Sequence, residues 1–276
     1  MATVLIAGCG YVGTVLGRLL HLDGDVVFGL RRNISRLPSF VHPLRADLAV
    51  SSSYQVIPAE VDEVVYTVSA DAFSPESYRR AYVEGLVSLL SVLESRGDQK
   101  PRRLVYVSST SVYGQTGGEL VDETSPTESS HFSGRVVLEG ERQALGSSIP
   151  TVVVRFGGIY GPERTRLIDQ VRQGAGCVSR PIRYTNRIHR DDCAGVLAHL
   201  LRLKSPRPVY LGVDDKPAPR CEVMRWLAGQ LGVPLDEHVD AMTIRSNKRC
   251  SNRRLRTSGY QFVYPTYRDG YRAILG

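Results

Sequence analysis

Six residues near the start of the chain have the spacing of a phosphate-binding turn. Gly8-Cys9-Gly10-Tyr11-Val12-Gly13 matches the pattern GxGxxG. In this pattern the first glycine permits a tight turn, the second lets the backbone approach a pyrophosphate, and the third packs a helix against a strand. The free N–H groups at the start of that helix would then face the anion. We predict that the backbone of Gly8, Gly10, Tyr11, Val12 and Gly13 binds a dinucleotide; the alternative is a tight strand–helix turn that binds nothing.

Two arginines follow at the place that selects between dinucleotides. About 20 residues after the glycines, an NAD site normally has an acidic residue that accepts hydrogen bonds from the ribose hydroxyls. Arg31 and Arg32 occupy this place instead. Guanidinium groups form charge-assisted bonds to phosphate, so the pair favours the 2′-phosphate of NADP over NAD. The alternative is that both arginines are solvated loop residues.

The elements that must position these groups alternate between strand and helix. Apolar runs at 3–7 and 26–30 flank a stretch with helical spacing that ends at Gly24. Further buried strands are predicted at 64–68, 104–108 and 151–155. A helix from Ser74 to about Arg96 separates the first two of these. The pattern predicts an α/β fold with a doubly wound parallel (Rossmann) sheet, which binds ligands at the carboxyl ends of its strands.

The second half of the chain predicts a smaller lobe. We expect a dinucleotide-binding domain at 1–160 and, at 161–276, mainly a substrate lobe that is interleaved with the core. A strand is predicted at 209–213. The helices predicted in this half cover 166–172, 193–203 and 219–231. Asp191 or Asp192 is expected to cap the second of these helices by accepting from its first N–H groups.

Composition and charge narrow the class of protein. The 276 residues are 42% hydrophobic and 23% charged, which is typical of a globular protein that buries a core. No stretch approaches the ~18 apolar residues of a membrane span, and no secretory leader is apparent, which predicts a cytoplasmic protein. Five cysteines without a CxxC pattern predict reduced thiols, and no metal site.

The two halves differ in charge. Residues 1–159 carry 14 basic and 17 acidic side chains, whereas residues 160–276 carry 21 and 11. This excess suits a small anionic substrate. Nucleic-acid binding is disfavoured, because the basic run at 245–256 has no interleaved aromatic residues on which bases could stack.

Four segments resemble the extended short-chain dehydrogenases/reductases, also called the NAD-dependent epimerase/dehydratase family. They are 82–90, similar to the family's NVxGTxNLL helix, 105–114, similar to its fifth strand, 155–162, similar to its RxxxxYGP segment, and 187–192, similar to its IHxDD turn. The glycine pattern is GxGxxG rather than the extended family's GxxGxxG. In this respect the chain is more similar to the atypical members.

The resemblance implies roles for individual residues. Ser109 matches the catalytic serine or threonine. The residues implied to contact the cofactor are Asp47 and Leu48 along the adenine, and Thr67, Val68 and Ser69 beside the ribose and nicotinamide. In extended relatives the C-terminal lobe closes over an anionic nucleotide-sugar. Gly158 and Arg187 are the predicted substrate contacts, and Arg183 and Arg249 are further cations that suit such a ligand.

The family's acid/base pair is missing. Its chemistry uses a Tyr-xxx-Lys pair on the helix after the catalytic serine, where the ammonium lowers the pKa of the tyrosine. Ser133 occupies the tyrosine position and Val137 the lysine position. His131 and Arg135 have the same spacing but are shifted by two residues, about 200° around a helix, and should point away from the cofactor. Tyr113, Tyr160 and Tyr184 are further candidates, none of them convincing.

The sequence therefore favours an atypical short-chain dehydrogenase/reductase that binds NADP(H). Its predicted chemistry is oxidoreduction, or an epimerase/dehydratase-like reaction, on a small anionic substrate that resembles a nucleotide-sugar. The missing pair supports an alternative, a catalytically silent protein that senses NADP and regulates a partner. We expect a monomer or a homodimer, without a membrane or nucleic-acid partner.

Overall fold

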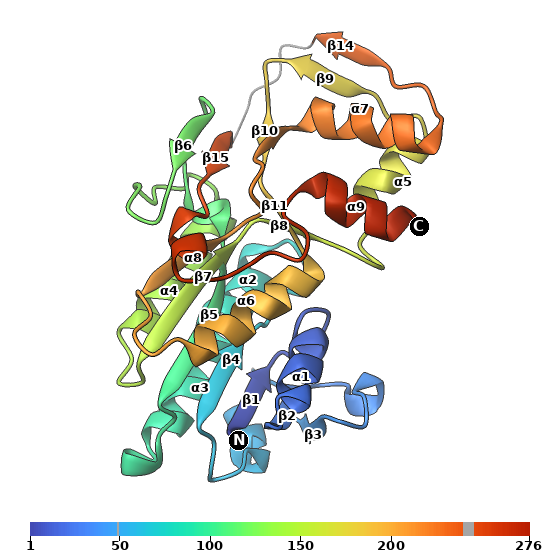
Figure 1. The fold of residues 1–276 in the computed structure, drawn as a ribbon. Helices are drawn as coiled ribbons and strands as arrows, with labels where there is room; N and C mark the ends of the chain where they lie inside the picture. The colour runs from blue at the N-terminus through green and yellow to red at the C-terminus, as the bar shows by residue number, and fades with distance from the viewer. Residues whose placement is uncertain (49, 240–245) are drawn as a thin grey trace.

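Seven parallel strands form the central sheet of the computed structural model, which describes residues 1–48, 50–239 and 246–276 (Figure 1). Their order is β12-β7-β5-β4-β1-β2-β3, and each neighbouring pair is parallel. The strands are β1 (Thr3–Ala7), β2 (Val26–Arg31), β3 (His42–Arg45), β4 (Glu63–Tyr66), β5 (Arg103–Ser109), β7 (Thr151–Phe156) and β12 (Val209–Gly212). The order reverses between β1 and β4, and such a switch point is where open α/β sheets bind ligands. The predicted fold class is confirmed.

Helices cover both faces of this sheet because its central strands are apolar on both sides. Val4 and Ile6 of β1 belong to one buried cluster with residues of α1 (Gly13–Leu22) and α6 (Arg190–Arg202), two helices that pack together. Leu5 and Ala7 point to the other face and join residues of α3 (Gly85–Glu94). This double burial explains the uninterrupted apolar run in β1. Helix α4 (Phe132–Leu145) lies beside α3 and also contacts β5 and β7.

A smaller lobe lies above the carboxyl ends of the strands in Figure 1. Its helices and its longer strands are α5 (Arg166–Arg172), α7 (Arg220–Leu231), α9 (Tyr267–Leu275), β9 (Cys177–Arg180) and β14 (Glu237–Val239). Helices α5, α7 and α9 share a buried cluster that includes Ile168, Met224 and Tyr271. The chain returns from this half to the sheet through α6 and β12. The domain division at residue 160 stays a prediction.

Short elements connect the sheet to the lobe. Paired short strands are β8 (Gly158–Tyr160) with β11 (Arg187–His189), β10 (Tyr184–Thr185) with β13 (Ala218–Pro219), and β6 (Glu119–Val121) with β15 (Lys248–Cys250). Short helical turns are η1 (Ile34–Arg36), η2 (Ser51–Val56), η4 (Gly97–Gln99), η5 (Thr110–Val112) and α8 (Arg253–Thr257). Within the described residues, no helix has the length and apolar character needed to cross a membrane.

The helix predicted from Ser74 to about Arg96 begins as expected but changes its winding. Ser74 caps α2 (Pro75–Arg79) by accepting from the Ser77 N–H at 3.2 Å, and Pro75 occupies the first turn. The turn that follows, η3 (Arg80–Glu84), is a π-helix, after which α3 resumes the α-helical winding. A π-turn adds a residue to the turn and re-aims the side chains on it.

The predicted cap of α6 is wrong. His189 is the N-cap, and its Nδ1 accepts from the Asp191 N–H at 3.2 Å. Asp192 is fully buried and accepts instead from the backbone N–H groups of Val263 and Tyr264, at 2.8 and 2.9 Å. The Asp192 carboxylate thus fastens a segment 71 residues further along the chain, because that segment presents two N–H groups without a partner in a strand or helix.

The prediction that all cysteines are reduced thiols is wrong for one pair. The structure joins Cys177 of β9 to Cys221 of α7 in a disulfide, with their Cα atoms 5.3 Å apart. Strand β9 packs against α7, so residues far apart in the sequence meet, and spacing along the chain gave no sign of it. Cys9, Cys193 and Cys250 are buried and free.

Candidate active site

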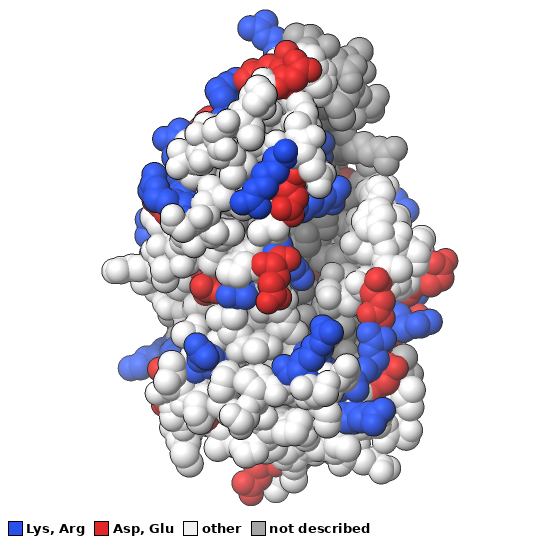
Figure 2. Space-filling view, turned by 90° about the vertical axis from the view of Figure 1, so that its right-hand side faces the viewer, with Lys and Arg blue, Asp and Glu red and all other residues white. Residues whose placement is uncertain are grey.

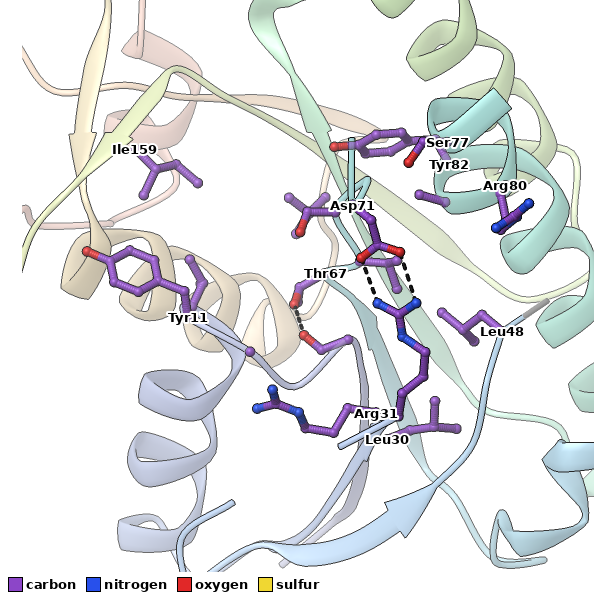
Figure 3. Close-up of a pocket in the computed structure, with 18 of the residues that line it drawn as sticks. Tyr11, Leu30, Arg31, Leu48, Thr67, Asp71, Ser77, Arg80, Tyr82 and Ile159 are labelled. Atoms are coloured by element: carbon purple, nitrogen blue, oxygen red, sulfur yellow. Dashed lines mark hydrogen bonds and ion pairs between the residues drawn. The ribbon is translucent and has the colours of Figure 1, made fainter. Parts of the chain in front are cut away.

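A cavity of about 540 Å³ lies at the carboxyl ends of β1, β2, β4 and β5, at the switch point of the sheet. Figure 3 shows Arg31 at the end of β2, Thr67 just after β4 and Tyr82 of the helical turn η3 around it. The residues predicted to bind or react that line this cavity are Gly8, Gly10, Tyr11, Val12, Arg31, Arg32, Asp47, Leu48, Thr67, Val68, Ser69 and Ser109. The structure therefore brings together groups that span about one hundred residues of sequence.

The glycine turn has the geometry of a phosphate cradle. Gly8 adopts a φ of +84°, and a Cβ there would lie 2.8 Å from the backbone of Val68. A Cβ on Gly10 would meet only the Gly8 carbonyl, at 3.7 Å, so the cavity is open beside Gly10. Gly13 begins α1 and packs against Ile6 rather than lining the cavity. An open backbone at the start of a ten-residue helix fits a dinucleotide pyrophosphate.

The loop is held from two sides. The Thr67 hydroxyl donates to the Gly8 carbonyl at 2.9 Å, which ties the turn to the end of β4. The Tyr11 hydroxyl donates to the Pro162 carbonyl at 2.6 Å, which ties it to the chain leaving β8. Two guanidinium groups, those of Arg164 and Arg190, lie 4.2 and 5.1 Å from the centre of the Tyr11 ring. Contacts within the protein thus hold the glycine turn on both sides.

The arginines that end β2 both face the cavity but have different partners. Arg31 donates to the Cys9 carbonyl at 3.1 Å. Arg32 forms a two-pronged ion pair with Asp71, at 2.6 and 2.9 Å, which Figure 3 shows as dashed lines. Its hydrogen bonds lower the pKa of the Asp71 carboxyl. Both side chains of this pair are more than half exposed. Arg32 is therefore held over the cavity by an acidic residue that sequence reasoning missed.

Three further cavity residues were also missed. Arg80 and Tyr82 come from the π-turn η3, and Arg164 follows β8. Figure 3 places Arg80 and Leu48 on the same side of the cavity, with Tyr82 above Asp71. Only Tyr82 stood inside a motif: it occupies the asparagine position of the NVxGTxNLL pattern. The tyrosine in place of the family's asparagine was therefore the only sign in the sequence that this position lines the cavity.

Ser109 ends β5 with its hydroxyl at the cavity. Its Oγ accepts from the Ser111 N–H at 3.1 Å and so caps the turn η5. Behind it, the buried Ser108 hydroxyl donates to the Glu141 carboxylate, which also forms two bonds to Arg155, at 2.7 and 2.9 Å. Arg155 donates in turn to the Tyr113 hydroxyl at 2.8 Å. The charges of Glu141 and Arg155 are therefore paired with each other. Tyr113 is buried in the same network.

The positions of the missing pair lie outside the cavity lining. Ser133 is buried at the start of α4, where its hydroxyl lies 2.8 Å from the His131 Nδ1. Val137 is 1% exposed and packs in a buried cluster with Val112. His131 caps α4 and stacks on Phe73, away from the cavity lining. Helix α4 contains neither tyrosine nor lysine.

The predicted substrate contacts lie beside the cavity and not in its lining. Gly158 and Arg187 are direct partners in the pairing of β8 with β11. Their neighbours Gly157 and Ile159 do line the cavity. Arg187 donates to the Tyr271 hydroxyl of α9 at 3.1 Å. The structure places the two residues between the cavity and the smaller lobe.

Comparisons with known proteins agree with this geometry. The profile of the NAD dependent epimerase/dehydratase family matches residues 4–192. A curated relative, the 3-diazoavenalumate denitrifying reductase of a Streptomyces species, is 28% identical, with 97% of this chain and 98% of that protein covered.

Two solved structures have a similar fold. One, from Methylobacillus flagellatus, carries a provisional assignment as an NAD-dependent epimerase/dehydratase; it is 37% identical with a TM-score of 0.84, covering 99% of this chain and 97% of that one. The other is the human epimerase family protein SDR39U1, solved with NADPH, with a TM-score of 0.82 at 22% identity over 99% and 98% of the two chains. The family profile, which covers more than half of the chain, settles the assignment: this chain belongs to the NAD dependent epimerase/dehydratase family.

Proposed function

We propose that the chain is an NADP-dependent oxidoreductase that acts on a small anionic substrate. The observation that carries the cofactor preference is the pair Arg31 and Arg32, which ends β2 on the wall of the cavity where an acidic residue would favour NAD. Guanidinium groups at this position can form paired, charge-assisted hydrogen bonds with a 2′-phosphate. Two relatives support the proposal: the Streptomyces protein is named a reductase, and the human protein has been solved with NADPH.

The test is the affinity for NADPH and for NADH. NADPH should bind at least about tenfold more tightly, because a charge-assisted hydrogen bond contributes about 1.5–3 kcal/mol. Arg32→Ala should remove most of this difference and leave NADH affinity nearly unchanged. Arg36→Ala is the matched control, since Arg36 lies in the neighbouring turn η1 and outside the cavity lining. Tighter binding of NADH by the unaltered protein would refute the cofactor assignment.

An anionic substrate is supported by a group of arginines in and next to the smaller lobe. Burial and then the nearby charges of Arg183, Arg187 and Arg166 lower the pKa of Arg220. Guanidinium groups that repel one another in this way are stabilised by an anion. Arg187 also lies on β11 next to the cavity lining, so a ligand could contact this group and the cofactor together.

The residues of the chain would bind the cofactor and the substrate and orient them toward each other. Bound NADPH supplies a hydride, and the chemistry of that transfer belongs to the nicotinamide. The glycine turn would hold the phosphates, Asp47 and Leu48 the adenosine, and Thr67, Val68 and Ser69 the ribose and nicotinamide. The Ser109 hydroxyl, at the end of β5, would donate a hydrogen bond to a substrate oxygen.

A silent NADP sensor is the second candidate, because α4 lacks the tyrosine and lysine of the family pair. A sensor would bind NADPH without oxidising it in the presence of carbonyl compounds. It would also bind a partner protein in only one redox state of the cofactor. Oxidation of bound NADPH by a carbonyl compound would exclude this candidate.

A further inference from the structure

One tyrosine enters the space next to the helix that lacks the family pair. Tyr82 lies in the π-turn η3, and its ring packs against a buried cluster that includes Val112 and Val137. Val137 stands where the family has its lysine. Tyr82 therefore reaches the neighbourhood of the missing pair from a different helix. Within the described chain η3 is the only π-helical segment, and such turns are often found at functional sites.

The Tyr82 side chain is directed into the cavity. Figure 3 shows its ring in the wall opposite Leu30, with the hydroxyl pointing inward. Tyr82 lines the same cavity as Thr67, Ser69 and Ser109, which the family resemblance places at the nicotinamide end. Tyr78, one turn earlier on the same helical segment, contacts the Tyr82 ring but does not line the cavity.

The Tyr82 hydroxyl has its proton available. The Ala70 backbone beside it favours the ionised form of the phenolic oxygen. The Ser109 Oγ accepts a hydrogen bond from the Ser111 N–H. Among the hydrogen bonds of the described residues, neither hydroxyl donates to a protein acceptor. The hydroxyl groups of Tyr82 and Ser109, both able to donate a hydrogen bond, thus line one cavity.

We propose that Tyr82 is the proton donor of this protein, acting together with Ser109 on the oxygen of a substrate carbonyl. The proposal rests on the oxidoreductase function proposed above. In the balanced step the carbonyl carbon gains the hydride that NADPH supplies, and the π pair of the C=O bond moves to the oxygen. That oxygen takes the phenolic proton of Tyr82, NADP⁺ is left, and the tyrosinate regains a proton from water.

The electrostatic surroundings suit a donor. Burial and, next, the neighbouring Tyr78 raise the pKa of Tyr82 to about 12, while the Ala70 backbone and the Arg164 guanidinium act in the opposite direction. Tyr82 therefore carries its proton at neutral pH, as a general acid must. Arg164 lines the cavity and would stabilise the tyrosinate that forms, which is the task of the lysine in the family pair.

The first test does not depend on turnover. The ionisation of Tyr82 is followed by ultraviolet difference titration, with Tyr82→Phe subtracted from the unaltered protein. Saturating NADP⁺ should lower the pKa of Tyr82 measurably, because the cationic nicotinamide ring would lie close to the hydroxyl. Tyr267→Phe, subtracted in the same way, is the control: Tyr267 lies on α9 outside the cavity lining, and NADP⁺ should leave its ionisation unchanged. A Tyr82 titration that is the same with and without bound NADP⁺ would overturn the proposal.

The second test measures NADPH oxidation with carboxybenzaldehyde, phenylglyoxylate and phenanthrenequinone as probes. Tyr82→Phe should lower turnover about 10²-fold or more, as expected for the loss of a general acid, with unchanged NADPH affinity. Tyr78→Phe should retain full turnover. If the unaltered protein oxidises NADPH with a probe and Tyr82→Phe does so equally well, the role of Tyr82 is refuted and the oxidoreductase function stands. If NADPH binds but no probe is reduced by the unaltered protein, the proposed function fails, and the role of Tyr82 with it.

Discussion

Arg32 and Asp71 form an ion pair in the lining of the cavity. Both of their bonds connect the end of β2 to the chain that follows β4, and both side chains are largely exposed. A 2′-phosphate that bound Arg32 would have to replace the Asp71 carboxylate. Asp71 therefore competes with the proposed ligand for the same guanidinium.

This competition predicts that Asp71→Asn raises the affinity for NADPH. An exposed ion pair contributes at most about 1 kcal/mol of stabilisation, so the affinity for NADPH should rise by up to about fivefold. NADH lacks the 2′-phosphate, and its affinity should change less. Fluorescence titration of both nucleotides provides the measurement. Weaker NADPH binding by Asp71→Asn would mean that the carboxylate assists the cofactor.

Asp214 is a buried acid between the sheet and the smaller lobe. It is 1% exposed, and its Oδ2, like the Tyr160 hydroxyl and the Arg187 Nε, has no hydrogen-bond partner among the described residues. Burial raises the pKa of Asp214 to about 8, despite the Lys216 N–H and Arg187, which lower it. An unfolded chain would titrate the same group near 3.9.

The raised pKa predicts a loss of stability with increasing pH. Between about pH 4 and pH 8 the folded protein retains a proton at Asp214 that the unfolded chain has released, so the free energy of unfolding falls across this range and levels off above it. Asp214→Asn lacks this ionisation. Its free energy of unfolding, relative to that of the unaltered protein, should rise by about 3–4 kcal/mol from pH 5 to pH 8, measured by urea unfolding. A difference between the two proteins that stays constant over this range would argue against a buried, protonated Asp214.

The glycine turn illustrates how one element depends on a close approach of two backbones. Gly8 and Gly24 have nearly the same conformation, with φ of +84° and +86°. A Cβ on Gly8 would collide with the backbone of Thr67 and Val68, whereas a Cβ on Gly24 would meet nothing within 4 Å. Substituting each glycine in turn therefore distinguishes two losses of stability: the loss from a left-handed backbone, which both positions share, and the loss from crowding, which occurs only at Gly8.

We therefore predict that Gly8→Ala is the more damaging of the two substitutions. Gly24→Ala should lower the free energy of unfolding by about 1–2 kcal/mol, the usual penalty for a left-handed non-glycine residue. Gly8→Ala should lose about 1–3 kcal/mol more through overpacking, and should weaken NADPH binding because the turn must move. Thermal unfolding and nucleotide titration of both variants check this. Equal losses in the two variants would contradict the proposed contact.

Local sequence patterns pointed to the cavity where a motif follows directly from an apolar strand. Gly8, Gly10 and the arginines at 31–32 line the cavity, and their contacts with a cofactor stay predictions. Tyr82 and Arg80 were missed because hydrophobic periodicity assumes a constant helical winding, and the π-turn alters it. The Asp71 partner and the Cys177–Cys221 bond depend on tertiary contacts between distant segments, which no local pattern records.

Acidic side chains neutralise part of the basic run at 245–256. Within the basic run, Arg245 lies outside the described residues, Arg254 approaches Glu123 at 3.5 Å, and Arg256 pairs with Asp215 at 2.6 Å. Figure 2 shows Lys and Arg scattered among acidic and uncharged side chains on the face in view. The net charge of +7 gives the molecule a long-range positive field.

Such a field should steer an anionic nucleotide to the cavity. The association rate constant of NADPH, measured by stopped-flow fluorescence, should fall several-fold between about 0.01 M and about 0.15 M salt, because the Debye length shrinks from about 30 Å to about 8 Å. NADH provides the control: it carries less negative charge, so its rate constant should fall less. The dissociation rate constants should change little, since contacts within the cavity are screened less than the long-range field. An association rate constant for NADPH that is independent of salt would show that the basic excess of the C-terminal half has no part in capturing the cofactor.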